Sequence, residues 1–131
     1  MRVLLIEDDS AVAQSIELML KSESFNVYTT DLGEEGVDLG KLYDYDIILL
    51  DLNLPDMGGI EILQRVKENI HLKSTPVVVL TTTDDSQEIR RCYELGCNVY
   101  VTKPVNYESF ANAIRQLGLF FSVIQVPAAA I

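Results

Sequence analysis

Acidic, hydroxyl and ammonium side chains stand directly after the apolar runs of this sequence. The set consists of Glu7 and Asp8 after residues 3–6, Asp51 after residues 47–50, Thr81 after residues 76–80, and Lys103 beyond residues 99–101. Three carboxylates in one pocket repel one another, and a hard divalent cation such as Mg²⁺ relieves that repulsion. A cation, a hydroxyl and an ammonium are also what phosphoryl transfer requires, because it depends on positioning and charge neutralisation. Asp51 is then the candidate nucleophile, which would form an acyl phosphate.

Strands and helices must alternate to position these residues. Short runs bounded by turn residues predict strands, and helical spacing of apolar residues between them predicts helices. We expect strands at residues 3–6, 25–30, 47–51, 76–80 and 99–101, and helices after residue 9, at 32–42, 60–67 and about 87–95, and from about 107. The first helix should bury Val12, Ile16, Met19 and Leu20, with Asp9 or Ser10 as its cap. This alternation predicts a parallel sheet whose strand ends bring the candidate residues to one edge.

Composition narrows the class of protein. A chain of 131 residues suits one domain, and its net charge of -10 argues against binding to nucleic acid or to an anionic membrane. No run is long enough for a signal peptide or a bilayer span. Cys92 and Cys97 have neither redox nor zinc spacing. We therefore expect a cytoplasmic protein with two reduced, structural thiols.

Four motifs resemble those of the receiver domain of two-component response regulators. They are residues 5–9 (LIEDD), 50–56 (LDLNLPD), 79–81 (VLT) and 100–104 (YVTKP), and the resemblance covers about residues 1–120. It implies a doubly wound, five-stranded parallel sheet of order 2-1-3-4-5 flanked by five helices, as in CheY-like proteins. The remaining residues, 121–131, would be an apolar extension of the last helix or a dimerisation tail.

The resemblance also implies a role for each motif residue. Asp51 is the phosphoacceptor, Asp8 and Asp51 bind Mg²⁺ directly, Glu7 binds it through water, and Asn53 offers its backbone carbonyl. Thr81 and Tyr100 form the switch, Lys103 pairs with the phosphate, and Pro104 shapes its loop. The implied donor is a sensor histidine kinase or a histidine phosphotransfer protein, and the implied output surface is the face made by the fourth helix, fifth strand and fifth helix. Catalysis would be limited to weak self-phosphorylation and autodephosphorylation.

Two parts of the chain resemble different receivers. Residues 1–57 are similar to the receivers of cell-cycle transcription regulators of the winged-helix class, whereas residues 76–119 are similar to stand-alone receivers, including phytochrome-associated ones. Residues 96–100 lack the acidic pair that winged-helix relatives usually carry before Tyr100. One hypothesis is a natural stand-alone regulator of mixed ancestry. The other is an engineered chimera joined between about residues 57 and 77.

Several alternatives remain at this point. Residues 118–126 are strongly apolar and either extend the last helix over the core or form a two-fold homodimer, which we favour. A phosphatase of the haloacid-dehalogenase type would also use an Asp and Mg²⁺, but it expects an acid where Asn53 stands. A binding-only pseudo-receiver and the truncated receiver of a DNA-binding regulator are further candidates, although the chain offers no basic recognition element of its own.

Overall fold

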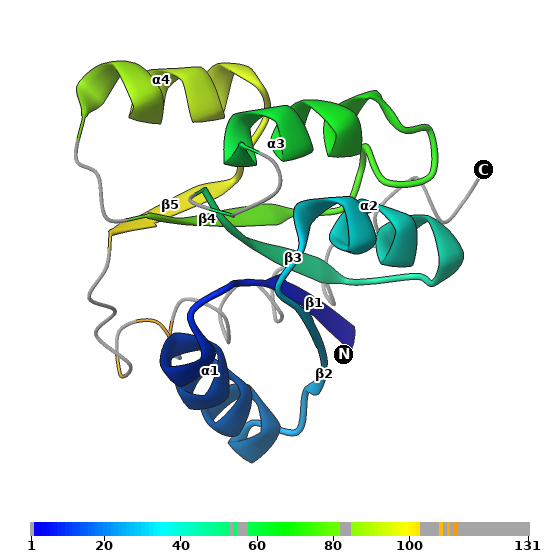
Figure 1. The fold of residues 1–131 in the computed structure, drawn as a ribbon, viewed down its shortest axis with the longest axis vertical. Coiled ribbons are helices and arrows are strands. Elements are labelled where there is room, and N and C mark those ends of the chain that lie inside the picture. The colour runs from blue at the N-terminus through cyan, green and yellow to red at the C-terminus, as the bar shows by residue number, and fades with distance from the viewer. Residues whose placement is uncertain are drawn as a thin grey trace.

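A five-stranded parallel sheet forms the centre of the molecule (Figure 1). The computed structural model describes residues 2–52, 54, 58–81, 85–102, 108, 110 and 112. The elements in chain order are β1 (Arg2–Ile6), α1 (Ser10–Ser22), β2 (Asn26–Thr30), α2 (Gly33–Leu42), β3 (Ile47–Asp51), α3 (Gly59–Glu68), β4 (Val77–Thr81), α4 (Ser86–Glu94) and β5 (Val99–Thr102). The strand order is β2-β1-β3-β4-β5, and every neighbouring pair is parallel. The predicted doubly wound sheet is therefore confirmed.

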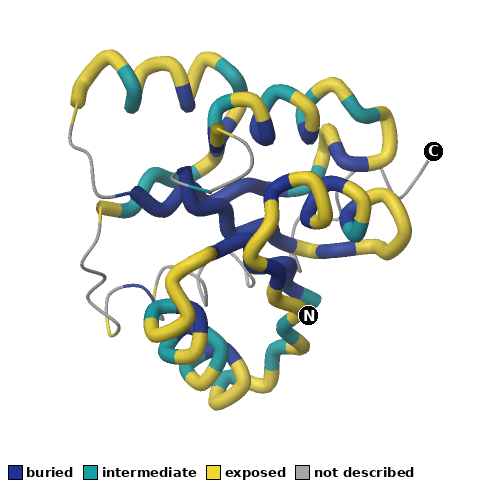
Figure 2. The backbone as a smooth tube through the Cα atoms, viewed as in Figure 1, coloured by how far each residue is buried: buried dark blue, intermediate teal, exposed yellow. Residues whose placement is uncertain are grey.

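Helices cover both faces of the sheet. α2, α3 and α4 lie on one face and α1 lies on the other (Figure 1), and the three central strands β1, β3 and β4 are buried almost throughout (Figure 2). β3 and β4 are buried along their whole length, as expected for strands between two helical layers. β2 lies at the edge of the sheet and is mostly exposed, which explains its more polar sequence.

The buried face of α1 differs in detail from the expected one. Ile16 and Leu20 are buried as predicted, but Ala13 is the third buried residue, while Val12 and Met19 are only partly buried. A small side chain at position 13 thus faces the sheet where helical spacing alone favoured larger ones. The spacing of apolar residues in the sequence thus predicted roughly which face of α1 is buried, but not the exact rotation of the helix about its axis.

α2 is one continuous helix despite its glycines. A Cβ atom on Gly36 would lie 2.5 Å from Ile6 Cδ1, so the missing side chain lets α2 approach β1 closely. Gly40 is similarly close to Leu72, which follows α3. The glycines therefore serve close packing and do not interrupt the helix.

α4 is the helix least embedded in the core. Cys92 is its one buried residue, and the rest of the helix is half-buried or exposed (Figure 2). Gly96 follows the helix at φ +102°, in the left-handed region that glycine tolerates, as expected for a helix stop. Cys97 is also buried, and both thiols are free, as predicted.

Part of the last predicted helix belongs to the described structure. Residues 108, 110 and 112 are helical, and Phe110 is buried in the core cluster on the α1 side of the sheet. Asn53, Lys103, Pro104 and residues 121–131 lie outside the described residues, so the expectations for them stay predictions. Among the described residues, no helix has the length and apolar character needed to cross a bilayer.

Candidate functional site

Three carboxylates meet at the carboxyl edge of the sheet. One oxygen each from Glu7, Asp8 and Asp51 lies within 4.8 Å of the other two. β1 and β3 are hydrogen-bonded neighbours, with Ile6 opposite Leu50, so the residues that follow each strand come together. Glu7 and Asp51 are each 1% exposed, whereas Asp8 is exposed to solvent. The sequence prediction that these acids converge is thus met by the geometry.

The loop that carries two of these acids is attached at both ends. The backbone N–H of Glu7 donates to the carbonyl of Thr30, at the end of β2, over 3.0 Å. Asp9 is the N-cap of α1, and its Oδ1 accepts hydrogen bonds from the N–H groups of Ala11 and Val12 at 3.0 and 3.2 Å. Of the two caps that the sequence allowed, Asp9 is therefore the one used. Asp8 lies between the two attachment points.

An open cleft of about 310 Å³ adjoins the acids. It lies between the loop before α1 and the loop before α2, and most of the residues that line it carry polar side chains. The lining residues are Glu7, Asp8, Ser10, Ala13, Gln14, Thr29, Thr30, Asp31 and Glu35. Solvent and small solutes can therefore reach Asp8, and the edge of the acid cluster, from this side.

Thr81 lies on the strand next to Asp51. Asp51 is in register with Leu80, which places Thr81 one residue further along β4, and Thr81 is fully buried. On β5, Tyr100 is opposite Val79 and Thr102 is opposite Thr81. Because side chains alternate along a strand, Thr81 and Tyr100 lie on the same face of the sheet. The two predicted switch residues are therefore close neighbours in the fold.

The acid cluster fits a hard divalent cation. Two of its three carboxylates are almost completely buried, and three like charges this close disfavour one another's ionised form. Oxygen ligands of this kind are those that Mg²⁺ and Mn²⁺ prefer, with water completing the coordination. Asp8 faces solvent, so a cation there would keep an exchangeable side. The donor set thus agrees with the cation that the sequence predicted.

The two thiols lie away from this cluster, and burial keeps them protonated. The pKa of the Cys97 thiol is raised to about 11, chiefly by burial and also by Cys92, while Lys67 lowers it. Burial also raises the pKa of Cys92, as does the neighbouring Glu88. Burial lowers the pKa of Lys67, which donates to the carbonyls of Lys73 and Thr75. These groups have a structural character, as expected for the cysteines.

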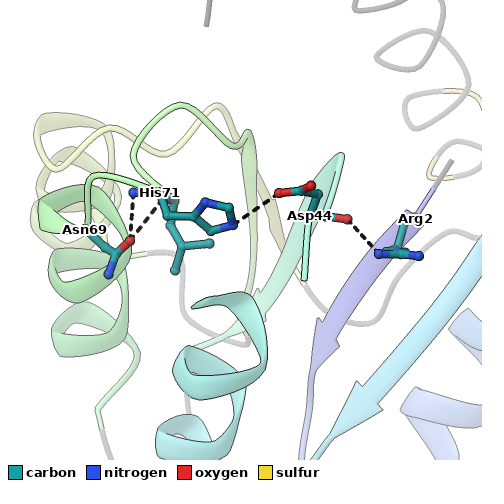
Figure 3. A network of polar contacts seen from close by, with 5 residues as sticks. Arg2, Asp44, Asn69 and His71 are labelled. Carbon is teal, nitrogen blue, oxygen red and sulfur yellow. Dashed lines mark hydrogen bonds and ion pairs between the residues drawn. The ribbon is translucent and has the colours of Figure 1, made fainter. Parts of the chain in front are cut away.

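Sequence reasoning missed a polar network at the opposite, amino edge of the sheet (Figure 3). His71 Nε2 lies 3.2 Å from Asp44 Oδ1, and the guanidinium of Arg2 donates to the Asp44 carbonyl over 3.4 Å. The N–H of His71 donates to Asn69 Oδ1 over 2.9 Å. His71 links the loop after α3 to the loop after α2. No local sequence signal connects these two loops.

The chain belongs to the response regulator receiver domain family, whose sequence profile matches residues 3–115. It is 58% identical over 117 residues to the cell cycle response regulator CtrA of Brucella ovis, covering 89% of this chain and 50% of CtrA. The chain therefore spans about half the length of the curated relatives it matches. These matches confirm the family that the sequence motifs indicated.

Solved structures agree with this assignment. A response regulator receiver domain from Rhodospirillum rubrum is 50% identical, covers 97% of both chains and superposes with a TM-score of 0.78. The Mn²⁺-bound form of the response regulator Rcp1 is 30% identical, covers 92% of this chain and 93% of its own, and has a TM-score of 0.77. The receiver class is thus favoured over the phosphatase class.

The similarity to CtrA was expected for residues 1–57. The 117-residue match extends through that half and across most of the second. The mixed-ancestry and chimera hypotheses concern the separate similarity of each half, and they stay hypotheses.

Proposed function

We propose that this receiver domain accepts a phosphoryl group from a phosphohistidine onto Asp51. The observation that carries the proposal is the cluster of Glu7, Asp8 and Asp51 at the carboxyl edge of the sheet. A carboxylate oxygen of Asp51 attacks the phosphorus, the N–P bond of the donor breaks, and the imidazole leaves. The donor would be a sensor histidine kinase or a histidine phosphotransfer protein.

Glu7, Asp8, Asp51 and the backbone carbonyl of Asn53 would hold Mg²⁺. When bound, the cation neutralises charge on the phosphoryl oxygens and offsets the repulsion between the three acids. Family membership and the Mn²⁺-bound state of the similar Rcp1 structure support this assignment. Lys103 would pair with the phosphoryl group, and Pro104 would shape the loop that carries it.

Output would follow from a shift between two conformations. Thr81 would turn toward the phosphoryl group, and Tyr100, on the same face of the sheet, would change its position with it. The affected surface would be that of α4, β5 and the last helix, which a downstream protein reads. Hydrolysis of the acyl phosphate returns the domain to its resting state, so the protein acts as a switch with weak activity on itself.

The net charge of the chain and its similarity to CtrA indicate which partners to expect. A net charge of -10 argues against direct binding of this domain to nucleic acid or membrane, and we propose a cytoplasmic location. A second candidate is the receiver part of a DNA-binding regulator, which the 58% identity to CtrA favours.

A homodimer through the last helix and residues 121–131 is a further proposal. Sedimentation of the wild type against a Phe120→Ala, Phe121→Ala double variant tests it, and a monomer in both would contradict it.

Phosphorylation by a small donor tests the main proposal. The wild type, Asp51→Asn and the control Asp38→Asn, on the exposed side of α2, are incubated with phosphoramidate and Mg²⁺. Mass spectrometry of the intact protein should find one phosphoryl group on the wild type and the control, and none on Asp51→Asn. Chelation of the cation should slow labelling strongly. Stoichiometric labelling of Asp51→Asn would refute the assignment of the phosphoacceptor.

A further inference from the structure

Asp9 stands beside the acid cluster but does not belong to it. The three acids whose oxygens converge are Glu7, Asp8 and Asp51. Asp9 instead turns its Oδ1 to the N–H groups of Ala11 and Val12, where it caps α1. Its carbonyl also accepts from the N–H of Ala13 at 2.9 Å, which begins the helix. The side chain of Asp9 is therefore engaged by backbone amides and is not aimed at a cation.

The three acids differ in how firmly the fold holds them. Asp51 is the last residue of β3, and its backbone is part of the sheet. Glu7 directly follows β1 and is attached to Thr30 through its N–H. Asp8 is the exposed member, and it has the fixed Glu7 on one side and the cap on the other. Of the three acids, Asp8 is thus the one whose backbone lies next to the cap and outside the strands of the sheet.

We propose that Asp9 is a positioning residue for the cation site. By fixing the first turn of α1, it holds Asp8 in the direction that the site needs. Without the cap, the N–H groups of Ala11 and Val12 lose their acceptor, the first turn of the helix loosens, and Asp8 samples other directions. This inference rests on the proposed cation site and adds a residue that acts on it through the backbone.

The alternative explanation is charge. Asp9 carries a negative charge next to the acid cluster, and its removal would weaken the attraction of a cation at a distance. Two substitutions distinguish the positioning explanation from the charge explanation. Asp9→Asn keeps an acceptor oxygen for the cap and removes the charge, whereas Asp9→Ala removes both. If Asp9 acts by positioning, Asp9→Asn keeps the wild-type affinity for Mg²⁺. If Asp9 acts through its charge, Asp9→Asn binds Mg²⁺ as weakly as Asp9→Ala does.

The experiment measures Mg²⁺ binding of the whole chain by calorimetry, with amide hydrogen exchange at Ala11 and Val12 as a second readout. We expect Asp9→Ala to bind Mg²⁺ about five-fold more weakly, the factor that corresponds to the loss of a typical cap. Faster exchange at Ala11 and Val12 should accompany the weaker binding. Asp9→Asn should match the wild type in both readouts.

A matched control comes from α4, whose N-cap Asp85 accepts a hydrogen bond from the N–H of Gln87 over 2.9 Å. Asp85→Ala removes a cap of the same kind and should leave Mg²⁺ affinity unchanged. Equal weakening by Asp85→Ala, equal weakening by Asp9→Asn, or wild-type affinity in Asp9→Ala would each overturn the positioning role. A wild type that binds no Mg²⁺ would overturn the cation site itself, and this inference with it.

Discussion

Thr81 of β4 and Tyr100 of β5 lie diagonally across the same face of the sheet. Their registry partners are Thr102 and Val79, so each is displaced by two residues from the other along neighbouring strands. Thr81 is fully buried and Tyr100 is half-buried. A movement of Thr81 toward the carboxyl edge would therefore change the space that the Tyr100 ring can occupy.

This relationship predicts that Tyr100 responds to the phosphoryl site through Thr81. The protein is labelled with fluorotyrosine, and the fluorine resonance of Tyr100 is assigned by its loss in Tyr100→Phe. Beryllofluoride is then added as a mimic of the phosphoryl group. The Tyr100 fluorine resonance should shift in the wild type, and the shift should be absent in Thr81→Ala. Thr102→Ala, which removes the exposed threonine paired with Thr81, should keep it. An undiminished shift in Thr81→Ala would mean that the two residues are not coupled.

The acid cluster should destabilise the metal-free protein. Oxygens of the three acids lie within 4.8 Å of one another, and two unit charges at that largest separation repel by about 3 kcal/mol at an effective dielectric constant of about 20. Asp51→Asn removes one of them, so its free energy of unfolding without cations should exceed that of the wild type by roughly 1–3 kcal/mol. Mg²⁺ should stabilise the wild type and have little effect on the variant.

Urea unfolding with and without Mg²⁺ measures both effects. Asp38→Asn, an exposed change on α2, controls for the loss of one negative charge from a chain of net charge -10. A metal-free Asp51→Asn that is less stable than the wild type would show that interactions of the Asp51 carboxylate outweigh its repulsion.

Gly59 should tolerate no side chain, whereas its neighbour should. A Cβ atom on Gly59 would lie 2.3 Å from Leu52 Cα, and on Gly58 it would meet nothing within 4 Å. Gly59→Ala is therefore expected to destabilise the fold by about 1–3 kcal/mol through overpacking. Because Leu52 directly follows Asp51, Mg²⁺ affinity should fall as well. Gly58→Ala should cost less than about 1 kcal/mol and keep the affinity.

Thermal and urea unfolding of the two glycine variants, with calorimetric Mg²⁺ titration, provides the comparison. Equal stability of both variants would mean that Leu52 can move away from α3 without cost, which its backbone contact with Gly59 argues against.

The raised pKa of the Cys97 thiol predicts that the folded protein loses stability at alkaline pH. Below about pH 9 the thiol is protonated in both the folded and unfolded chain, so its contribution is complete. Above that pH the unfolded thiol ionises while the folded one, with a pKa of about 11, stays neutral. The free energy of unfolding should therefore fall as pH rises, by about 1 kcal/mol between pH 8 and 10.

Comparison of the wild type with Cys97→Ala isolates this effect, since other ionising groups contribute to both. The difference in unfolding free energy between the two proteins, measured under reducing conditions, should shrink from pH 8 to pH 10. A constant difference would place the folded-state pKa of Cys97 near its ordinary value.

The sequence predicted those features that depend on the order of the strands and helices and on which residues are buried. Apolar runs that end in Glu7, Asp8 and Asp51, combined with the rule that parallel strands end at one edge, were enough to place the acid cluster. The order of the strands followed from the family resemblance. Thr81 and Tyr100 were identified from motifs, although their shared face required the strand register.

Details set by packing between distant segments were not predictable. Nothing local indicates that Ala13 faces the sheet in place of Val12, because the rotation of α1 depends on the surface it covers. The glycines of α2 suggest a weak helix until Ile6 is seen to occupy the space they leave. The contact of His71 with Asp44 joins two loops that no sequence period relates.

The single buried side chain of α4 sets how much free energy its displacement requires. Exposing one core side chain costs about 2 kcal/mol, and the remaining residues of α4 already contact solvent. Coupling free energies between sites in proteins are typically about 1–3 kcal/mol. The small buried area of α4 therefore keeps the free energy needed to shift this helix within the range that a typical coupling between two sites supplies.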